Sequence, residues 1–125
     1  MTTVLLIEDN QENADMTIRI LQSAQYNVLH CLRGFQGAKV ARHEHPDVIL
    51  VDFDLPDVQG YTVALMLRKQ LGKAAPPIIA VTARVGVAEI QIAEIYGCQA
   101  FISKPFLPEE LLSIVDHVLK TKANP

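Results

Sequence analysis

Residues 48–54 read Val-Ile-Leu-Val-Asp-Phe-Asp, an apolar run that turns acidic at its end. Four apolar residues in a row, with no polar residue between them, are typical of a strand that is buried on both faces. Strands of this kind form parallel sheets whose two faces are covered by helices. The stretch therefore predicts a central strand with two carboxylates, Asp52 and Asp54, at its C-terminal end.

Apolar runs of similar length recur along the chain, and each is followed by a polar junction and a helical pattern. The five runs lie at residues 4–7, 27–31, 48–51, 77–81 and 100–102. The second and fifth are shorter or more polar, which suits the edges of a sheet. Strands that alternate with helices predict an α/β fold with a doubly wound parallel sheet. Two common strand orders fit such a sheet, and five strands with five helices match the flavodoxin-like order 2-1-3-4-5.

The first helix follows Asn10, a residue type that caps helix N-termini. The apolar residues expected on its buried face are Ala14, Ile18, Leu21 and Ala24. The other four helices are expected at residues 34–44, 60–71, 86–96 and 108–120.

The chain has 125 residues, the length of one compact domain, so a single domain over residues 1–125 is expected. Half of the residues are hydrophobic and 20% are charged, a composition that excludes an intrinsically disordered protein. A net charge of -3 argues against direct binding to nucleic acid. No apolar run is long enough to span a bilayer, and no basic leader precedes the first strand. We therefore expect a cytoplasmic protein with no membrane association.

The two cysteines, Cys31 and Cys98, form no C-x-x-C pair. In the predicted strand order they lie near opposite edges of the sheet, too far apart for a disulfide. We expect two reduced thiols with no metal-binding role.

Polar residues follow the strands at the sheet edge where doubly wound folds bind their ligands. The junction residues are Glu8 and Asp9 after the first strand, Asp52 and Asp54 after the third, Thr82 after the fourth, and Ser103 and Lys104 after the fifth. The four histidines are expected to be surface residues that do not reach this crevice; they are His30, His43, His45 and His117.

The types of these residues indicate phosphoryl chemistry. Glu8, Asp9 and Asp52 would repel one another unless a cation neutralised them, and an all-oxygen ligand set suits Mg²⁺. Lys104 offers a point charge for phosphate and Thr82 offers a hydroxyl donor. The sequence has no P-loop and no G-x-G-x-x-G motif, so a nucleotide site is excluded. What remains is a carboxylate nucleophile beside a metal ion and a lysine, a set that can form an aspartyl phosphate.

Four segments in order resemble the response-regulator receiver domain of two-component signalling, the chemotaxis-receiver-like module. They are Val-Leu-Leu-Ile-Glu-Asp-Asn at 4–10, Pro-Asp-Val-Ile-Leu-Val-Asp-Phe-Asp-Leu-Pro-Asp-Val-Gln-Gly at 46–60, Ile-Ala-Val-Thr-Ala at 79–83 and Gly-Cys-Gln-Ala-Phe-Ile-Ser-Lys-Pro-Phe at 97–106. The resemblance covers nearly the whole chain and implies a single receiver domain with no output domain in this sequence.

The resemblance implies a role for each junction residue. Asp52 would be the phosphoacceptor, taking its phosphoryl group from a histidine kinase or a histidine phosphotransfer protein. Mg²⁺, or Mn²⁺ in its place, would be bound by Asp9, Asp52 and the backbone carbonyl of Asp54, with Glu8 helping through water.

Thr82 and Lys104 would contact the phosphoryl group, and the bond between Lys104 and Pro105 would be cis. Phe101 falls at the position of the family's aromatic switch residue. Asp54 and Arg84 lie two residues after Asp52 and Thr82, where they are expected to tune the lifetime of the phosphate.

Signalling is expected to leave through the fourth helix, fifth strand and fifth helix, toward a downstream protein or a second copy of the chain. The apolar residues of the fourth helix exceed what one buried stripe can hold, so some should be exposed. No enzymatic activity is expected beyond self-phosphotransfer and autodephosphorylation.

Two other functions fit parts of the pattern. Asp52-Phe53-Asp54 resembles the D-x-D nucleophile motif of haloacid-dehalogenase-like phosphatases, although that motif usually follows the first strand of a longer chain. A phosphorylation-independent interaction module with the same fold is the second alternative. Such modules generally lose an acidic residue or the lysine, and here Asp9, Asp52 and Lys104 are all present.

Overall fold

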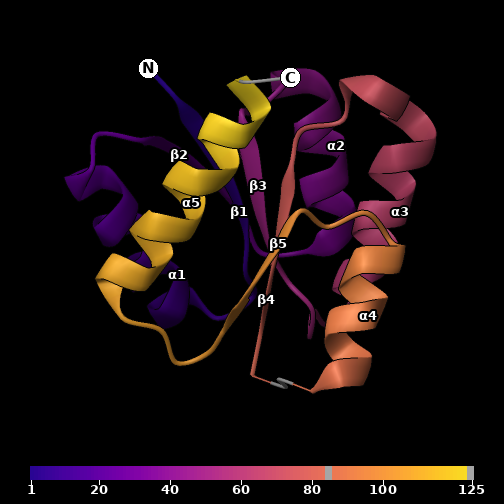
Figure 1. Cartoon of the computed structure of the whole chain (residues 1–125). Coiled ribbons are helices and arrows are strands. Elements are labelled where there is room, and N and C mark those ends of the chain that lie inside the picture. The colour runs from indigo at the N-terminus through magenta and orange to yellow at the C-terminus, as the bar shows by residue number, and fades with distance from the viewer. Residues whose placement is uncertain (84–85, 124–125) are drawn as a thin grey trace.

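A computed structural model describes residues 1–83 and 86–123 of the chain. Its elements, in chain order, are β1 (Thr3–Ile7), α1 (Gln11–Ser23), β2 (Asn27–Cys31), α2 (Gly34–Glu44), β3 (Val48–Asp52), α3 (Gly60–Leu71), the 3-10 turn η1 (Gly72–Ala74), β4 (Ile78–Thr82), α4 (Val87–Ile95), β5 (Ala100–Ser103) and α5 (Pro108–Ala123). The strands are parallel and lie in the order β2-β1-β3-β4-β5, which confirms the predicted topology (Figure 1).

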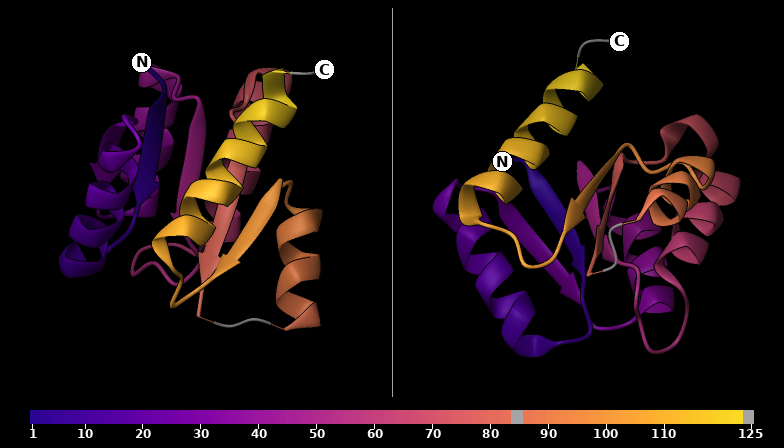
Figure 2. Two further views of the ribbon diagram at one scale, coloured as in Figure 1. Left: turned by 60° about the vertical axis from the view of Figure 1, so that its left-hand side comes forward. Right: turned by 60° about the horizontal axis from the view of Figure 1, so that its bottom comes forward.

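Three layers make up the molecule, with the sheet between two sets of helices. Helices α1 and α5 cover one face, and α2, α3 and α4 cover the other (Figure 2). Neighbouring residues of a strand point to opposite faces, so Leu5 and Ile7 pack under α2 and α3 while Val4 and Leu6 pack under α1 and α5. All five residues of β3 are buried. The uninterrupted apolar run therefore exists because this strand has a helical layer on each side.

The buried face of α1 differs from the prediction at its last residue. Ala24 is exposed, and the buried positions are Ala14, Thr17 and Leu21. The helix ends at Ser23, and the chain turns toward β2 through Gln25 at a positive φ of 68°. Ala24 thus lies one step past the helix, where the 3.6-residue periodicity no longer applies.

Three other helix ends, in α4 and α5, differ slightly from the predicted bounds. Helix α4 covers Val87–Ile95, one residue shorter at each end than expected, because Gly86 and Tyr96 are its cap residues. Gly97 follows with φ at 85°, a conformation that favours glycine. Helix α5 continues to Ala123, three residues beyond the expected end at Lys120.

The start of α2 is stabilised by a side chain from a distant loop. Arg33, at the N-cap, gives the helix no side-chain hydrogen bond. Instead the carboxylate of Asp57, in the loop after β3, accepts hydrogen bonds from the backbone N–H groups of Gly34 (2.9 Å) and Phe35 (3.1 Å). Partial burial raises the pKa of Asp57, but these hydrogen bonds outweigh it and the pKa is lowered overall. The first turn of a helix has N–H groups without partners, so an anion there is favourable.

We expect Asp57→Ala to lower the free energy of unfolding by about 1 kcal/mol, the usual effect of losing a helix cap. Folding lowers the pKa of Asp57, so the ionised carboxylate adds to the free energy of unfolding at pH values above the ordinary aspartate pKa. This stabilisation is lost as the pH falls through the pKa of Asp57 in the folded chain. Urea denaturation at neutral and acidic pH measures both effects. Asp116→Ala, at an exposed aspartate of α5, is the control, and an equal effect of both changes would contradict the cap.

Candidate functional site

The acidic residues of the sequence meet at the carboxyl ends of β1 and β3. The two strands pair with Ile7 opposite Val51, so the next residues, Glu8 and Asp52, lie at the same level. Glu8, Asp9 and Asp52 each offer a carboxylate oxygen, and these oxygens lie within 4.8 Å of one another. Glu8 is 4% exposed and Asp52 is 5% exposed, whereas Asp9 faces solvent.

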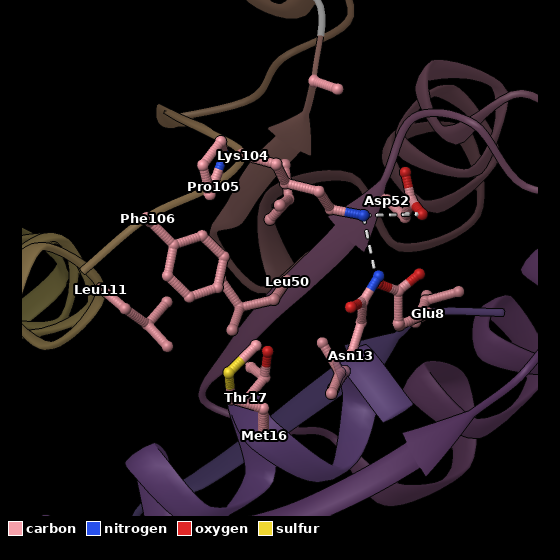
Figure 3. Close-up of a pocket in the computed structure, with 14 residues that line it drawn as sticks. Glu8, Asn13, Met16, Thr17, Leu50, Asp52, Lys104, Pro105, Phe106 and Leu111 are labelled. Carbon is pink, nitrogen blue, oxygen red and sulfur yellow. Dashed lines mark hydrogen bonds and ion pairs between the residues drawn. The ribbon is translucent and has the colours of Figure 1, made fainter. Parts of the chain in front are cut away.

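Lys104 bridges the two buried carboxylates. Its Nζ lies 3.1 Å from Glu8 Oε1 and 3.1 Å from Asp52 Oδ2 (Figure 3). The lysine follows β5, and its backbone N–H donates to the carbonyl of Thr82 at 2.8 Å. The peptide bond between Lys104 and Pro105 is cis, the isomer that the resemblance implied. The side chain of Lys104, which follows β5, thus reaches past the end of β4 to the carboxylates at the ends of β1 and β3.

The ionisation of these groups follows from burial and from their neighbours. Burial, with help from Asp52, raises the pKa of Glu8 to about 7. Burial also acts to raise the pKa of Asp52, but hydrogen bonds from Glu8, from the Asp54 N–H and from Lys104 outweigh it and the pKa is lowered. Burial opposes the charge of Lys104, but the two carboxylates raise its pKa overall. Asp52 is therefore the ionised carboxylate, and Glu8 is the one that takes up a proton.

One carboxylate oxygen of Glu8 has no hydrogen-bond partner in the described part of the chain. Glu8 Oε2 is buried and makes no hydrogen bond within the described residues. A buried carboxylate oxygen without a donor is costly, and a cation at this place would satisfy it. Together with the oxygens of Asp9 and Asp52, it makes the cluster a fitting site for a hard divalent ion. The acidic cluster can therefore bind a metal.

The chain after Asp52 is fixed from two sides. Asp54 donates its backbone N–H to Asp52 Oδ1 at 2.9 Å, so both carboxylate oxygens of Asp52 have donors. The start of α3 lies directly behind, because a Cβ on Gly60 would come within 2.5 Å of the Asp52 carbonyl oxygen. Glycine at this position allows the helix to approach the end of β3 closely.

The remaining predicted residues lie around the cluster at different depths. Thr82 is 2% exposed at the end of β4, beside Ser103 of β5. Phe101 is half-buried on β5 and packs on the side of the sheet that faces α3 and α4. Asp54 is exposed. Arg84 lies outside the described residues.

Two features of the site were not predicted. His30 contacts the backbone of the site, with Nε2 at 2.9 Å from the carbonyl oxygen of Glu8, a contact that the sequence pattern did not indicate. The contact depends on the register of β1 and β2, in which His30 lies opposite Leu6, two residues before Glu8. The second feature is an apolar cavity of about 270 Å³ between α1 and α5, bordered by Met16 and Phe106 and reaching Lys104 (Figure 3). Its existence depends on the spacing of two helices, which no sequence pattern specifies.

Helix α4 is almost entirely on the surface. Ala93 is its one buried residue, and the exposed apolar side chains are Val87, Ile90, Ile92 and Ile95. The expectation that this helix exposes apolar residues is confirmed. Its C-terminal end is linked to α3 by the ring of Tyr96, whose centroid is 5.0 Å from that of Tyr61, and by Arg68, which donates to the Gly97 carbonyl.

Cys31 and Cys98 are both free thiols, as predicted. Burial raises the pKa of Cys98 to about 12 and also raises the pKa of Cys31. Within residues 1–83 and 86–123, no helix has the length and apolar character needed to cross a membrane.

The raised pKa of Glu8 predicts how stability depends on pH without metal. The folded chain holds a proton there up to about pH 7, whereas an ordinary glutamate loses it near 4.5. The stabilisation is thus complete below the ordinary pKa and is lost as the pH rises through about 7. In EDTA, the free energy of unfolding of the parent should fall over this range relative to Glu8→Gln, as measured by urea denaturation. The free energy of unfolding of Glu44→Gln, a change at the exposed end of α2, should vary with pH as that of the parent does. If the difference in free energy of unfolding between the parent and Glu8→Gln did not vary with pH, the raised pKa of Glu8 would be contradicted.

Comparison with known proteins gives a consistent result. Residues 4–116 match the response regulator receiver domain family. The polar-differentiation response regulator DivK of Brucella ovis is 33% identical over 103 residues, which cover 82% of this chain and 84% of that protein. Hybrid signal transduction histidine kinase G of Dictyostelium discoideum is 32% identical over 116 residues, which cover 90% of this chain but 3% of the kinase.

A solved structure agrees with these sequence matches. The chemotaxis response regulator CheY4 of Vibrio cholerae superposes with a TM-score of 0.88 at 28% identity. The superposition covers 94% of this chain and 98% of that one. The haloacid-dehalogenase-like phosphatase is not favoured by any of these matches, and its D-x-D pattern follows β3 rather than β1.

Proposed function

This chain belongs to the response regulator receiver domain family, and we propose that it signals by accepting a phosphoryl group on Asp52. The donor is a histidine kinase or a histidine phosphotransfer protein. The observation that carries the proposal is the bridge from Lys104 to Asp52 and Glu8, which gathers a nucleophile, a cation and a metal ligand at one sheet edge.

Asp52 is suited to act as the nucleophile. Its lowered pKa keeps the carboxylate ionised, and its two oxygens are oriented by Lys104 and by the Asp54 N–H. In the transfer, a carboxylate oxygen forms a bond to phosphorus while the bond from phosphorus to the donor nitrogen breaks. The donor imidazole leaves with that electron pair, and Lys104 stabilises charge on the phosphoryl oxygens.

We propose Mg²⁺ as the metal ion, with Mn²⁺ as a substitute. Asp9, Asp52 and the backbone carbonyl of Asp54 would bind it, and Glu8 would contribute through water. The unpartnered Glu8 Oε2 and the all-oxygen donor set support this assignment. When bound, the ion neutralises charge on the transferring phosphoryl group.

The signal is proposed to pass from Thr82 to α4, β5 and α5. The Thr82 hydroxyl would contact the phosphoryl group, and the ring of Phe101 would fill the space that Thr82 leaves. The exposed apolar residues of α4 support a protein-binding surface there, for a downstream target or a second copy of the chain.

Asp54 and Arg84 are proposed to set the lifetime of the phosphate by orienting or repelling the attacking water. The exposed carboxylate of Asp54, two residues from Asp52, supports the first assignment. The assignment for Arg84 rests on its sequence position alone.

We also propose that residues 1–125 form a single receiver domain, and that the protein acts in the cytoplasm without contacting nucleic acid or membrane. Its chemistry would be limited to self-phosphotransfer and autodephosphorylation. The relatives include a response regulator of similar length and a much longer hybrid histidine kinase. Similar sequences therefore occur both as short regulators and within longer proteins.

Incubation with acetyl phosphate should add one phosphoryl group to the chain in the presence of Mg²⁺ and none in EDTA, as measured by intact mass. Asp52→Asn should abolish the addition because it removes the nucleophilic oxygen. Asp116→Asn, at an exposed aspartate of α5, is the matched control and should be labelled like the parent. Labelling of Asp52→Asn would rule out the site, and a phosphate ester hydrolysed with many turnovers would favour the phosphatase instead.

Ile95→Asp tests the proposed output surface, because Ile95 is 77% exposed and its replacement leaves the core intact. We expect the variant to fold and to be phosphorylated like the parent but to lose phosphorylation-dependent self-association or target binding. Sedimentation and retention of target proteins measure the change. Phe35→Asp, at an exposed apolar residue of α2, should have no effect. Unchanged association of Ile95→Asp would place the output elsewhere.

A further inference from the structure

We propose that His30, on the edge strand β2, is a positioning residue for the metal site. Its imidazole holds the backbone between Glu8 and Asp9, the segment that carries two of the acidic ligands. This inference rests on the metal site of the proposed function and concerns a residue outside the acidic cluster itself.

The argument begins with the way β1 ends. The pairing of β1 with β2 stops at Ile7 opposite Cys31. One more backbone bond follows, from the Glu8 N–H to the Cys31 carbonyl at 3.0 Å. The Glu8 carbonyl lies past the last pair of this ladder, and the His30 side chain contacts it at 2.9 Å. The imidazole of His30 therefore holds one more backbone group of this segment, the Glu8 carbonyl, beyond the last backbone hydrogen bond between β1 and β2.

The contact also fixes the proton on the ring. A carbonyl oxygen only accepts hydrogen bonds, so Nε2 of His30 is the donor and carries a hydrogen. In the neutral ring this selects the Nε2–H tautomer. The hydrogen bond therefore predicts that neutral His30 in the parent protein carries its proton on Nε2.

Asp9 lies between two fixed residues. On one side, Glu8 is held by β2 through its N–H and its carbonyl. On the other side, Asn10 caps α1: its side chain accepts from the Asn13 N–H at 2.9 Å, and its carbonyl accepts from Ala14 at 2.9 Å. The connection from β1 to α1 has three residues, so anchoring both ends restricts the direction of the exposed Asp9 carboxylate.

Such restriction matters because a metal ion binds best to ligands that are already oriented. Side chains that hold metal ligands in place commonly change metal affinity by about tenfold or more when they are removed. Loss of the His30 donor would free the peptide between Glu8 and Asp9 to rotate, and the cluster would have to be reordered on binding. His30 would therefore act on affinity for the ion without touching it.

The test compares the metal affinities of full-length variants in the absence of a phosphodonor. His30→Leu removes the donor, and His30→Gln keeps an N–H donor on a side chain of similar reach. His43→Leu is the control, because His43 lies on α2 and its ring contacts the Lys39 carbonyl of the same helix. Calorimetry with Mg²⁺ and electron paramagnetic resonance with Mn²⁺ report affinity without relying on phosphorylation.

We expect His30→Leu to bind Mg²⁺ about tenfold more weakly than the parent, and His30→Gln to restore most of the loss. His43→Leu should bind like the parent. If His30→Leu bound Mg²⁺ as tightly as the parent, the role of His30 would be overturned, but the metal site would not. The same conclusion would follow if His30→Gln bound Mg²⁺ as weakly as His30→Leu. A parent that binds neither ion would overturn the metal site and this inference together.

A second measurement needs no variant and so remains available if His30→Leu does not fold. A long-range ¹H–¹⁵N spectrum of the metal-free parent at alkaline pH reports which nitrogen of His30 carries the proton. The Nε2–H tautomer supports the contact, and the Nδ1–H tautomer overturns it.

Discussion

The bridge from Lys104 to Glu8 and Asp52 is the interaction on which the rest of the site depends. Parallel pairing of β1 with β3 forces two carboxylates to the same level, in a place where water is largely excluded. Without a cation, that arrangement would be strongly unfavourable, because removing one partner of a buried charge cluster leaves the others uncompensated. Lys104 compensates the charge of this cluster when no metal is bound. In the proposed function, the same ammonium would contact the phosphoryl group.

The two helical layers serve different purposes. On one side, α1 and α5 pack apolar stripes against the sheet and keep a cavity beside the site. On the other side, α4 fully buries Ala93 alone, and it leaves Val87 and Ile95 largely in solvent. A helix with few fully buried apolar contacts can move at a lower free-energy cost than the core elements. The ring contact between Tyr61 and Tyr96 limits that movement at the C-terminal end of α4.

Features set by periodicity and by strand ends could be predicted from the sequence. The five strands, their order, and the gathering of Glu8, Asp52 and Lys104 at one edge follow from short apolar runs with polar residues after them. Features that depend on exact three-dimensional spacing could not. Ala24 was misplaced because the periodic pattern does not reveal where a helix stops. The contact of His30 was missed because it needs the register of two strands, and the cavity because it needs the distance between two helices.

The cap on α2 has a consequence for the order in which the chain can acquire structure. Asp57 follows Gly34 by 23 residues, with the whole of β3 between them. A nascent chain that has emerged only as far as β3 has no carboxylate for the first turn of α2, so this helix end stays frayed until the next loop arrives. The first turn of α2 therefore depends on a residue that lies after β3 in the chain, and a truncated chain ending before residue 57 would lack this cap.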